Sequence, residues 1–159
     1  MAGTFELRLD KAIMTEPAAL QTELVTPALK PLEISFPLPK ALHTTGHVHV
    51  TFLAHCAMVF LSTSTPGDSA GSIKPLGSFV YAMPDRTSTG TISTTLYATA
   101  SSIEYTTRVA KILARRIRMP VYVGCSIDPH GLGLTVEEEM EGLIQFVNVV
   151  VEKFSSQQQ

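Results

Sequence analysis

Short apolar runs, bounded by proline, glycine or polar residues, dominate the first half of the chain. Residues 32–36 form the first run, and because Pro37 follows it we predict a strand at the edge or end of a sheet. Residues 47–53 alternate between apolar and polar side chains, whereas residues 57–61 are apolar throughout. The break between these two runs is short, which predicts a hairpin. Residues 76–83 supply a third apolar strand in this region.

After a weakly alternating stretch at residues 91–97, the spacing of apolar residues changes from strand to helix. Ser101 and Glu104 have the spacing of a capping box, in which a hydroxyl and a carboxylate satisfy N–H groups of the first helical turn. Pro120 would end this helix, and the β-branched run at residues 121–123 predicts a strand directly after it. The apolar positions at helical spacing are Ile103, Ala110, Leu113, Ala114 and Ile117.

The last third of the chain predicts a turn, a short strand and a second helix. The turn covers residues 128–131 and the strand residues 132–136. Glutamates at residues 137–139 suit a helix N-terminus, where negative charge is favoured by the helix dipole. We expect residues 155–159 to form a disordered tail. The apolar positions of this second helix are Met140, Leu143, Ile144, Val147, Val151 and Phe154.

This order of elements predicts an α+β fold with a largely antiparallel β-sheet and two main α-helices on one face. Residues 32–154 would form this domain, preceded by an irregular N-terminal extension over residues 1–31 and followed by the tail at residues 155–159. Several strands are apolar on both sides, and the chain has too few strands to build a second sheet. We therefore expect the other sheet face to pack on a partner subunit.

Composition agrees with one domain that hides part of its surface. The chain has 159 residues, of which 45% are hydrophobic and 16% charged, against an ordinary charged content of about 25%. A net charge of −2 gives no general attraction for nucleic acid. We see neither a signal peptide nor a membrane span, and we expect Cys56 and Cys125 to be buried reduced thiols. The prediction is a cytoplasmic protein that could also enter the nucleus, without a nucleic-acid or membrane partner.

Ser69 lies in a Gly-x-Ser-x-Gly pattern at residues 67–71, the signature of a hydrolase nucleophile elbow. That chemistry needs the serine on a tight turn between a strand and a helix, with a histidine and an acid brought to it. Here the pattern lies within a Ser/Thr/Gly/Pro-rich stretch at residues 63–75, where Pro75 follows and no helix can begin. We favour an exposed loop and assign no catalytic residue.

His47, His49 and His55 could suggest a metal site, since His47 and His49 share one side of a predicted strand. No Cys-x-x-Cys or His-Glu-x-x-His pattern accompanies them, and a zinc site needs three or four ligands. We therefore predict no metal or cofactor and interpret His47 and His49 as structural or partner-binding residues.

The basic face of the predicted first helix holds five cations, of which Arg116 and Arg118 lie near its end. Arg108, Lys111 and Arg115 fall at i, i+3 and i+7, so they share one side of this helix. Three interpretations stay open: a solvated face, a docking surface for an acidic protein patch, or a nucleic-acid contact. The last lacks the interleaved aromatic residues expected of a single-strand binder. We name these three residues as candidates for partner binding.

Four short sets of residues occur in a distinctive order. They are residues 47–61, Thr87-Ser88-Thr89-Gly90, Leu113-Ala114-Arg115 with the strand that follows, and Glu138-Glu139-Met140-Glu141 leading to Glu152-Lys153-Phe154. In this order they resemble the proteasome assembly chaperone 4 family over residues 32–154. The extension before Leu32 and the enlarged loop at residues 63–75 depart from that family.

The resemblance implies a non-enzymatic chaperone. Members of this family pair with a proteasome assembly chaperone 3 subunit of related fold. The pair binds proteasome α-subunits, notably α5, and promotes assembly of the 20S α-ring. Two other functions stay open: a small dimerisation scaffold of the roadblock or longin kind, and a small serine hydrolase that uses Ser69.

Overall fold

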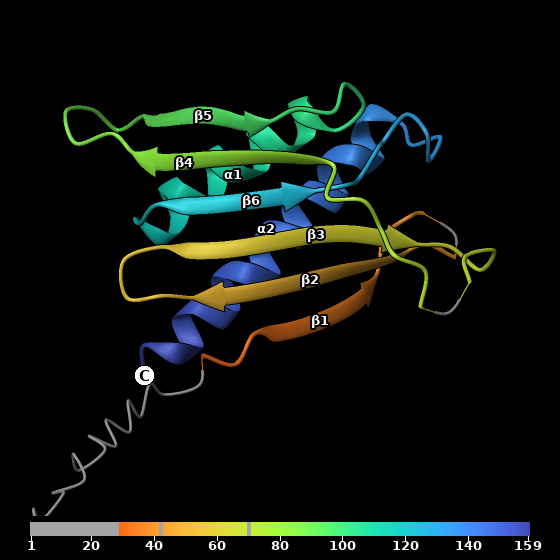
Figure 1. Cartoon of the computed structure of the whole chain (residues 1–159), viewed down its shortest axis with the longest axis horizontal. Coiled ribbons are helices and arrows are strands. Elements are labelled where there is room, and N and C mark those ends of the chain that lie inside the picture. Colours follow the sequence, from red (N-terminus) through yellow and green to blue (C-terminus); the bar gives the residue numbers. More distant parts are fainter. Residues whose placement is uncertain (1–28, 42, 70) are drawn as a thin grey trace, which may run out of the picture.

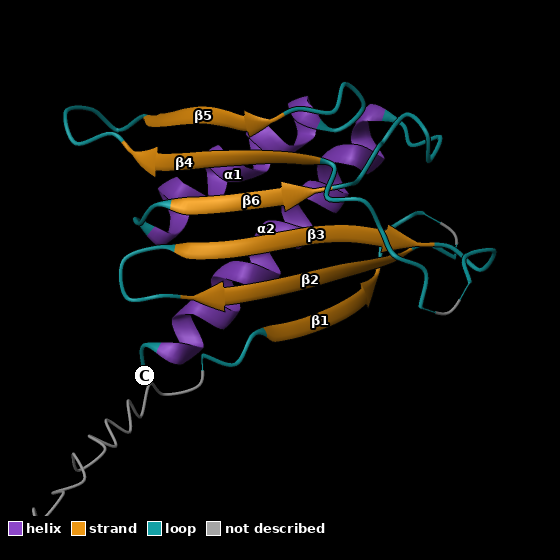
Figure 2. Cartoon of the chain, in the orientation of Figure 1, coloured by secondary structure: helices purple, strands orange, loops and turns teal. Residues whose placement is uncertain are grey.

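Within the described residues, six strands form one sheet, and both helices lie on the same side of it (Figures 1 and 2). The computed structural model describes residues 29–41, 43–69 and 71–159. The predicted N-terminal extension lies outside the described residues as far as residue 28. The described part is an α+β fold with a largely antiparallel sheet, which confirms the predicted fold class.

The strands follow the order β1-β2-β3-β6-β4-β5 across the sheet. Neighbouring strands are antiparallel except β3 and β6, which are parallel. This exception arises because the chain leaves β3, forms the β4–β5 hairpin and a helix, and returns as β6 in the middle of the sheet. The strands are β1 (Leu32–Pro37), β2 (Thr45–Phe52), β3 (Ala57–Ser64), β4 (Ser78–Pro84), β5 (Thr91–Tyr97) and β6 (Val121–Cys125).

Two strand predictions are confirmed in detail. β1 is an edge strand that ends at Pro37, where the missing N–H of proline leaves no neighbour unsatisfied. β2 and β3 form the predicted hairpin, with Phe52 opposite Ala57 and Thr45 opposite Ser64. The core lies between the sheet and the helices, and its fully buried strand residues are mostly valines, such as Val59 and Val123.

The helix α1 (Ile103–Ile117) begins one residue later than predicted, and the predicted capping box at Ser101 and Glu104 is wrong. Ser102 occupies the N-cap, but its hydroxyl makes no capping bond because it accepts from the N–H of Ser78 at 3.1 Å. The two serine hydroxyls also share a hydrogen bond of 2.9 Å. Glu104 instead contacts Arg108 at 2.7 Å. The start of α1 is therefore tied to the start of β4.

The predicted apolar stripe of α1 is confirmed at its centre and C-terminal end. Ala110, Leu113 and Ala114 are fully buried and Ile117 nearly so. These residues lie in the core, where α1 contacts β4 and β6. The helix ends at Arg118, whose backbone adopts the left-handed conformation with φ 55° and ψ 35°.

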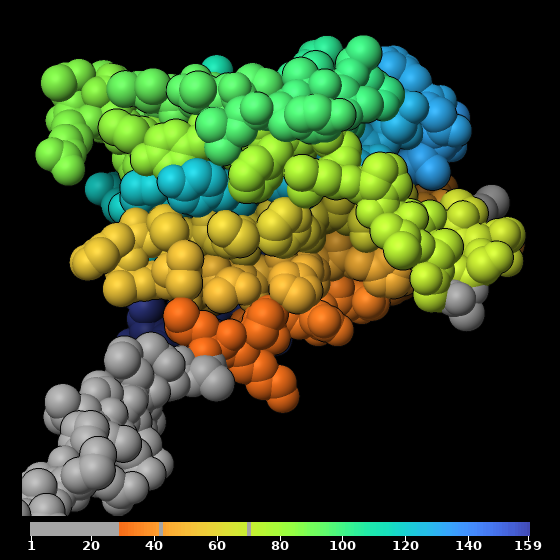
Figure 3. All heavy atoms as spheres, in the orientation of Figure 1, coloured from red at the N-terminus to blue at the C-terminus, as the bar shows by residue number. Residues whose placement is uncertain are grey.

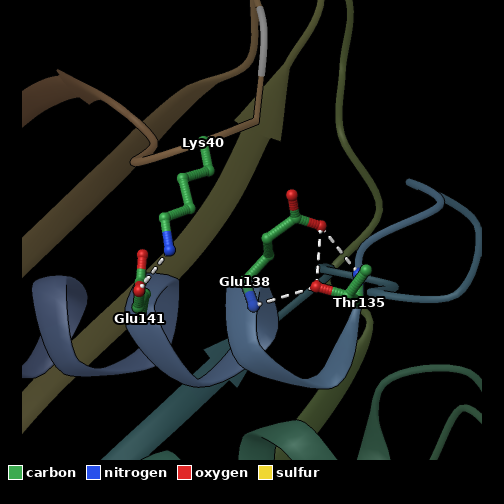
Figure 4. Close-up of polar contacts among 4 residues, drawn as sticks. All are labelled: Lys40, Thr135, Glu138 and Glu141. Atoms are coloured by element: carbon green, nitrogen blue, oxygen red, sulfur yellow. Dashed lines mark hydrogen bonds and ion pairs between the residues drawn. The ribbon is translucent and has the colours of Figure 1, made fainter.

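A capping box does occur, at the start of α2 (Val136–Gln157), as Figure 4 shows. The N–H of Glu138 donates to Thr135 Oγ1 at 3.3 Å, and the N–H of Thr135 donates to Glu138 Oε2 at 2.8 Å. Residues 132–136, predicted as a strand, instead form a turn and the first residue of α2. The prediction was wrong because the Thr-x-x-Glu spacing at residues 135–138 competes with the strand pattern and starts a helix.

The buried side of α2 differs from the predicted stripe. Leu143 and Val147 are buried, but Met140 and Ile144 are 40% and 49% exposed, and Phe146 takes their place in the core. Phe146 reaches the sheet over Gly46, where an added Cβ would lie 2.7 Å from its ring. The helix therefore turns the Phe146 side toward the sheet, where Gly46 leaves room for the ring.

The predicted boundary of the C-terminal tail also moves, because α2 continues through Gln157. The hydroxyl of Ser155 donates to the carbonyl of Val151 at 3.0 Å, and that of Ser156 to the carbonyl of Glu152 at 2.9 Å. These bonds keep both serines in the helix, where a polar tail was expected.

Candidate functional site

The sheet face turned away from the helices is uncovered within the described part of the chain, and Figures 1 and 3 view the molecule from that side. Side chains of this open sheet face alternate with those of the core. On β3, Val59 and Leu61 belong to the core, whereas Met58 and Phe60 are only partly buried. On β4, Tyr81 is partly buried in the same way. The open face therefore carries large apolar side chains in direct contact with solvent.

Aromatic rings form a row across this face, which we call the aromatic row: His49, Phe60, Phe79, Tyr122 and Tyr81. The rings of Phe60 and Phe79 are stacked at 6.2 Å, nearly parallel with 7° between their planes. Phe79 is stacked on Tyr122 at 6.1 Å, and Tyr122 lies 4.8 Å from Tyr81. His49 meets the edge of Phe60 at 6.2 Å. Four neighbouring strands thus present one continuous platform of rings.

Gly124 makes this platform possible. It lies on β6 directly opposite Phe60 of β3 and Phe79 of β4, so the two stacked rings meet over a position without a side chain. A Cβ at Gly124 would lie 2.6 Å from Phe60 Cδ1 and 2.8 Å from Leu76 Cδ1. Any larger residue would push the rings apart.

A hollow of about 430 Å³ adjoins the row between β1, β2, β3 and the segment that leads into β4. Phe60 and Gly124 form part of its wall, and Leu76, which is 47% exposed, closes one side. The open face therefore combines a flat aromatic platform with a concave region. Such a combination of apolar rings and an adjoining hollow is typical of a protein–protein contact surface.

The two histidines predicted as partner-binding residues both lie on this face, at the wall of the hollow. His47 has its two ring nitrogens at hydrogen-bond distance from serine hydroxyls, with Nδ1 2.8 Å from Ser35 Oγ and Nε2 2.7 Å from Ser64 Oγ. His49 Nδ1 lies 3.6 Å from Glu33 Oε1. His47 is thus a satisfied structural residue that links three strands, whereas His49 belongs to the exposed aromatic row. Among the described residues, no three His, Cys, Asp or Glu side chains gather as metal ligands would.

Ser69 lies in the exposed loop that follows β3. His47, Asp68 and Ser69 line one shallow hollow of about 380 Å³. However, the nitrogens of His47 face Ser35 and Ser64, and one carboxylate oxygen of Asp68 accepts from Thr65 N–H at 2.9 Å and from Lys74 Nζ at 2.6 Å. No hydrogen bond joins Ser69 Oγ to His47 in the described residues, and no helix follows the loop. This arrangement lacks the geometry of a catalytic triad.

The three basic residues predicted on one side of α1 have different surroundings. Arg108 forms ion pairs with Glu104 of the same helix at 2.7 Å and with Glu139 of α2 at 3.1 Å. Its positive charge is therefore balanced by carboxylates of the two helices. Lys111 and Arg115 are exposed and make no ion pair with a described carboxylate. Arg108 is therefore a structural ion-pair residue, and the exposed charge lies further along α1.

Sequence reasoning missed the aromatic row and the left-handed backbone of Arg118. The ring-bearing strands were predicted, but which rings meet depends on β6 entering between β3 and β4, which periodicity does not reveal. Arg118 itself was predicted as one of the cations of the basic helix face. Its place next to Met119 and Pro120 was the available signal, because a helix that must stop before proline often ends in a left-handed residue.

The chain is similar to known proteins in both sequence and fold. A family model described as proteasome assembly chaperone 4 matches residues 45–127. No curated protein matches the chain. A solved structure described as a novel chaperone complex for yeast 20S proteasome assembly contains a chain of similar fold, with a TM-score of 0.60 and 18% identity. The match covers 79% of this chain and 97% of that chain. None of the helices within the described residues is long and apolar enough to cross a membrane.

Proposed function

The chain belongs to the proteasome assembly chaperone 4 family, and from this premise we propose that it is a non-enzymatic chaperone subunit of 20S proteasome assembly. It pairs with a proteasome assembly chaperone 3-like subunit, and the pair holds α-subunits, notably α5, while the α-ring forms. We place this work in the cytoplasm, with the nucleus as a second compartment. The similar fold of a chain in a yeast proteasome assembly chaperone complex supports this proposal.

The aromatic row on the open sheet face is the observation that best supports pairing with a second chaperone subunit. A buried aromatic side chain contributes about 150–250 Å² of apolar surface, so a few such rings supply much of the about 800 Å² that each partner gives to a stable interface. Phe60, Phe79 and Tyr122 are partly exposed in the single chain. A partner sheet packed on them would form a two-layer sandwich with helices outside.

The mechanism needs binding alone. A chaperone that binds a partial α-ring better than separate subunits shifts the population toward the ring by its difference in affinity. Release follows when a later subunit occupies or strains the same contact. No covalent step or cofactor enters this cycle.

The proposal is tested by co-expressing the chain with a proteasome assembly chaperone 3 subunit and measuring the complex by sedimentation velocity. Phe60→Glu puts a charge in the middle of the aromatic row, where burial against a partner would desolvate it. We expect this variant to lose the heterodimer. Ile144→Glu is the matched control, because Ile144 is an exposed apolar residue of α2 on the opposite side of the molecule.

Two results would contradict the pairing through the open face. One is a Phe60→Glu chain that keeps its thermal unfolding temperature and still forms the heterodimer. The other is loss of the heterodimer in Ile144→Glu alone, which would move the contact to the helices. Capture of separately purified α-subunits by the wild-type pair tests the α-ring part of the proposal.

A further inference from the structure

A second hollow lies at the far end of α1, away from the aromatic row. It has a volume of about 350 Å³ and is formed where the end of the helix meets the turn between β4 and β5. None of its residues belongs to the aromatic row. Its lining consists of Pro84, Asp85, Ser88, Thr89, Gly90, Arg115 and Arg118.

The β4–β5 turn that forms one wall is held in shape by its own hydrogen bonds. The Asp85 carboxylate accepts from Ser88 Oγ at 2.7 Å, from Thr87 Oγ1 at 2.8 Å and from Thr87 N–H at 2.9 Å. These bonds, with that from Ser88 the strongest, lower the pKa of Asp85 below its ordinary value. The N–H of Gly90 donates to Ser88 Oγ at 3.1 Å. The carboxylate is thus occupied within the turn.

The other wall carries two exposed guanidinium groups with no carboxylate partner. Arg115 and Arg118 make no ion pair in the described part of the chain, and Asp85 lies beyond ion-pair distance from both. Arg108, two turns earlier on the same side of α1 as Arg115, shows the contrast, because it is paired with two glutamates. The hollow therefore contains two guanidinium groups that have no described carboxylate partner. Its one carboxylate, that of Asp85, is already hydrogen-bonded within its own turn.

The backbone of Arg118 adds an independent observation. Its φ of 55° is a left-handed conformation that glycine adopts at helix ends without a penalty, whereas a long side chain is disfavoured there. The backbone conformation alone therefore does not favour an arginine at this position. Arg118 nevertheless lines the hollow together with Arg115.

From these observations we infer that the hollow is a docking site for glutamate or aspartate side chains of a partner protein. This inference rests on the proposed function, and the partner it specifies is an acidic patch of a proteasome α-subunit. Guanidinium groups bind carboxylates through paired hydrogen bonds, and the Ser88 and Thr89 hydroxyls border the same space. A free phosphate fits less well, since its higher charge would lie close to Asp85. The predicted basic surface is therefore centred on Arg115 and Arg118 and excludes Arg108.

The first test is a titration of the full chain, in complex with its chaperone partner, with acetylated hexaglutamate amide followed by NMR. The amide signals of Ser88, Thr89 and Gly90 should shift with hexaglutamate, and should stay in place with hexaglutamine. Inorganic phosphate is the third probe. Shifts caused by phosphate and not by hexaglutamate would overturn the assignment to an acidic protein, and so would equal shifts with hexaglutamine.

The second test measures capture of purified α-subunits by the chaperone pair. Arg115→Glu should weaken capture by about tenfold, whereas Arg116→Glu, an equal charge change at an adjacent exposed residue outside the hollow, should have little effect. Arg118→Gly should also weaken capture while its thermal unfolding temperature stays the same or rises, since glycine suits the backbone there. Equal losses in Arg115→Glu and Arg116→Glu would overturn the site in favour of general charge attraction. If the wild-type pair captures no α-subunit, the proposed function fails instead.

Discussion

Single residues with small side chains decide where the large ones of this protein lie. Gly124 leaves the space over which Phe60 and Phe79 stack on the open face. Gly46 does the same on the core face, where the ring of Phe146 fills the space. Both glycines lie inside strands, where glycine is otherwise unfavourable. Their presence is explained by the rings that approach them from neighbouring elements.

Ser102 is a second kind of decisive residue, since its buried hydroxyl joins α1 to β4 through Ser78. We expect Ser102→Ala to lower the free energy of unfolding by about 1–3 kcal/mol, because it leaves the buried N–H of Ser78 without its acceptor. Ser101→Ala is the control: Ser101 is exposed, and its loss should change stability by less than about 0.5 kcal/mol. Urea unfolding of both variants measures the difference. A larger effect at Ser101 would restore the capping box predicted from the sequence.

At the scale of elements, hydrogen bonds at the start of α2 fix both its first residue and the way it meets the sheet. The Thr135–Glu138 box sets the N-terminus, and Lys40 contacts Glu141 one turn later at 2.7 Å (Figure 4). Lys40 comes from the segment between β1 and β2, so this ion pair joins that segment to the helix. The capping box and the ion pair together hold the N-terminal half of α2 next to β2.

The capping box should be visible in the pH dependence of stability. Hydrogen bonds from Thr135, first its backbone N–H and then its hydroxyl, lower the pKa of Glu138 in the folded chain. A lowered pKa means that the ionised carboxylate stabilises the fold above its unfolded pKa, and that this contribution is lost as the pH falls through the folded value. Glu138→Gln should therefore destabilise the chain at neutral pH, with the deficit vanishing toward low pH.

The control for this prediction is Glu137→Gln, a neighbour in the same first turn that is outside the box. Both substitutions remove one charge near the helix N-terminus, so their difference reports what the Glu138 carboxylate gains from Thr135 and, to a smaller extent, from Lys40. Thermal unfolding at a series of pH values provides the measurement. If the two variants lose the same stability at every pH, the hydrogen bonds of the box contribute nothing beyond the helix dipole.

The elements themselves were largely predictable, and their partners were not. Alternation and breaks between runs correctly indicated the β2–β3 hairpin, the β1 edge and the buried side of α1. The position of β6 between β3 and β4 could not be read from the sequence, because a parallel neighbour depends on a crossover and leaves no local pattern. Part of the buried side of α2 was misjudged for a similar reason, since Met140 and Phe146 are both apolar and the space that the ring of Phe146 fills lies over Gly46 on a distant strand.

At the scale of the whole molecule, two surfaces of opposite character lie apart. The open sheet face is apolar and aromatic, and the hollow at the end of α1 is positively charged. The proposed functions divide between them in the same way, with the chaperone partner on the sheet and the α-subunit at the hollow. The candidate residues His47 and His49 lie on the open sheet face, and Arg115 lies at the hollow. The sequence alone could not show that these candidates belong to two different surfaces.

Salt should therefore act differently on the two contacts. Raising the ionic strength from about 0.01 M to about 1 M shortens the Debye length from about 30 Å to about 3 Å, which screens exposed charges but leaves apolar burial intact. We expect α-subunit capture to weaken strongly over this range while the chaperone pair survives. By the same reasoning, the isolated chain should self-associate through its open face at every salt concentration, and its chaperone partner should suppress that association. Sedimentation velocity at each ionic strength tests both expectations. If the isolated chain is a stable monomer, the open face is not an interface. If the chaperone pair dissociates at high salt, the charged surface binds the chaperone partner and not the α-subunit.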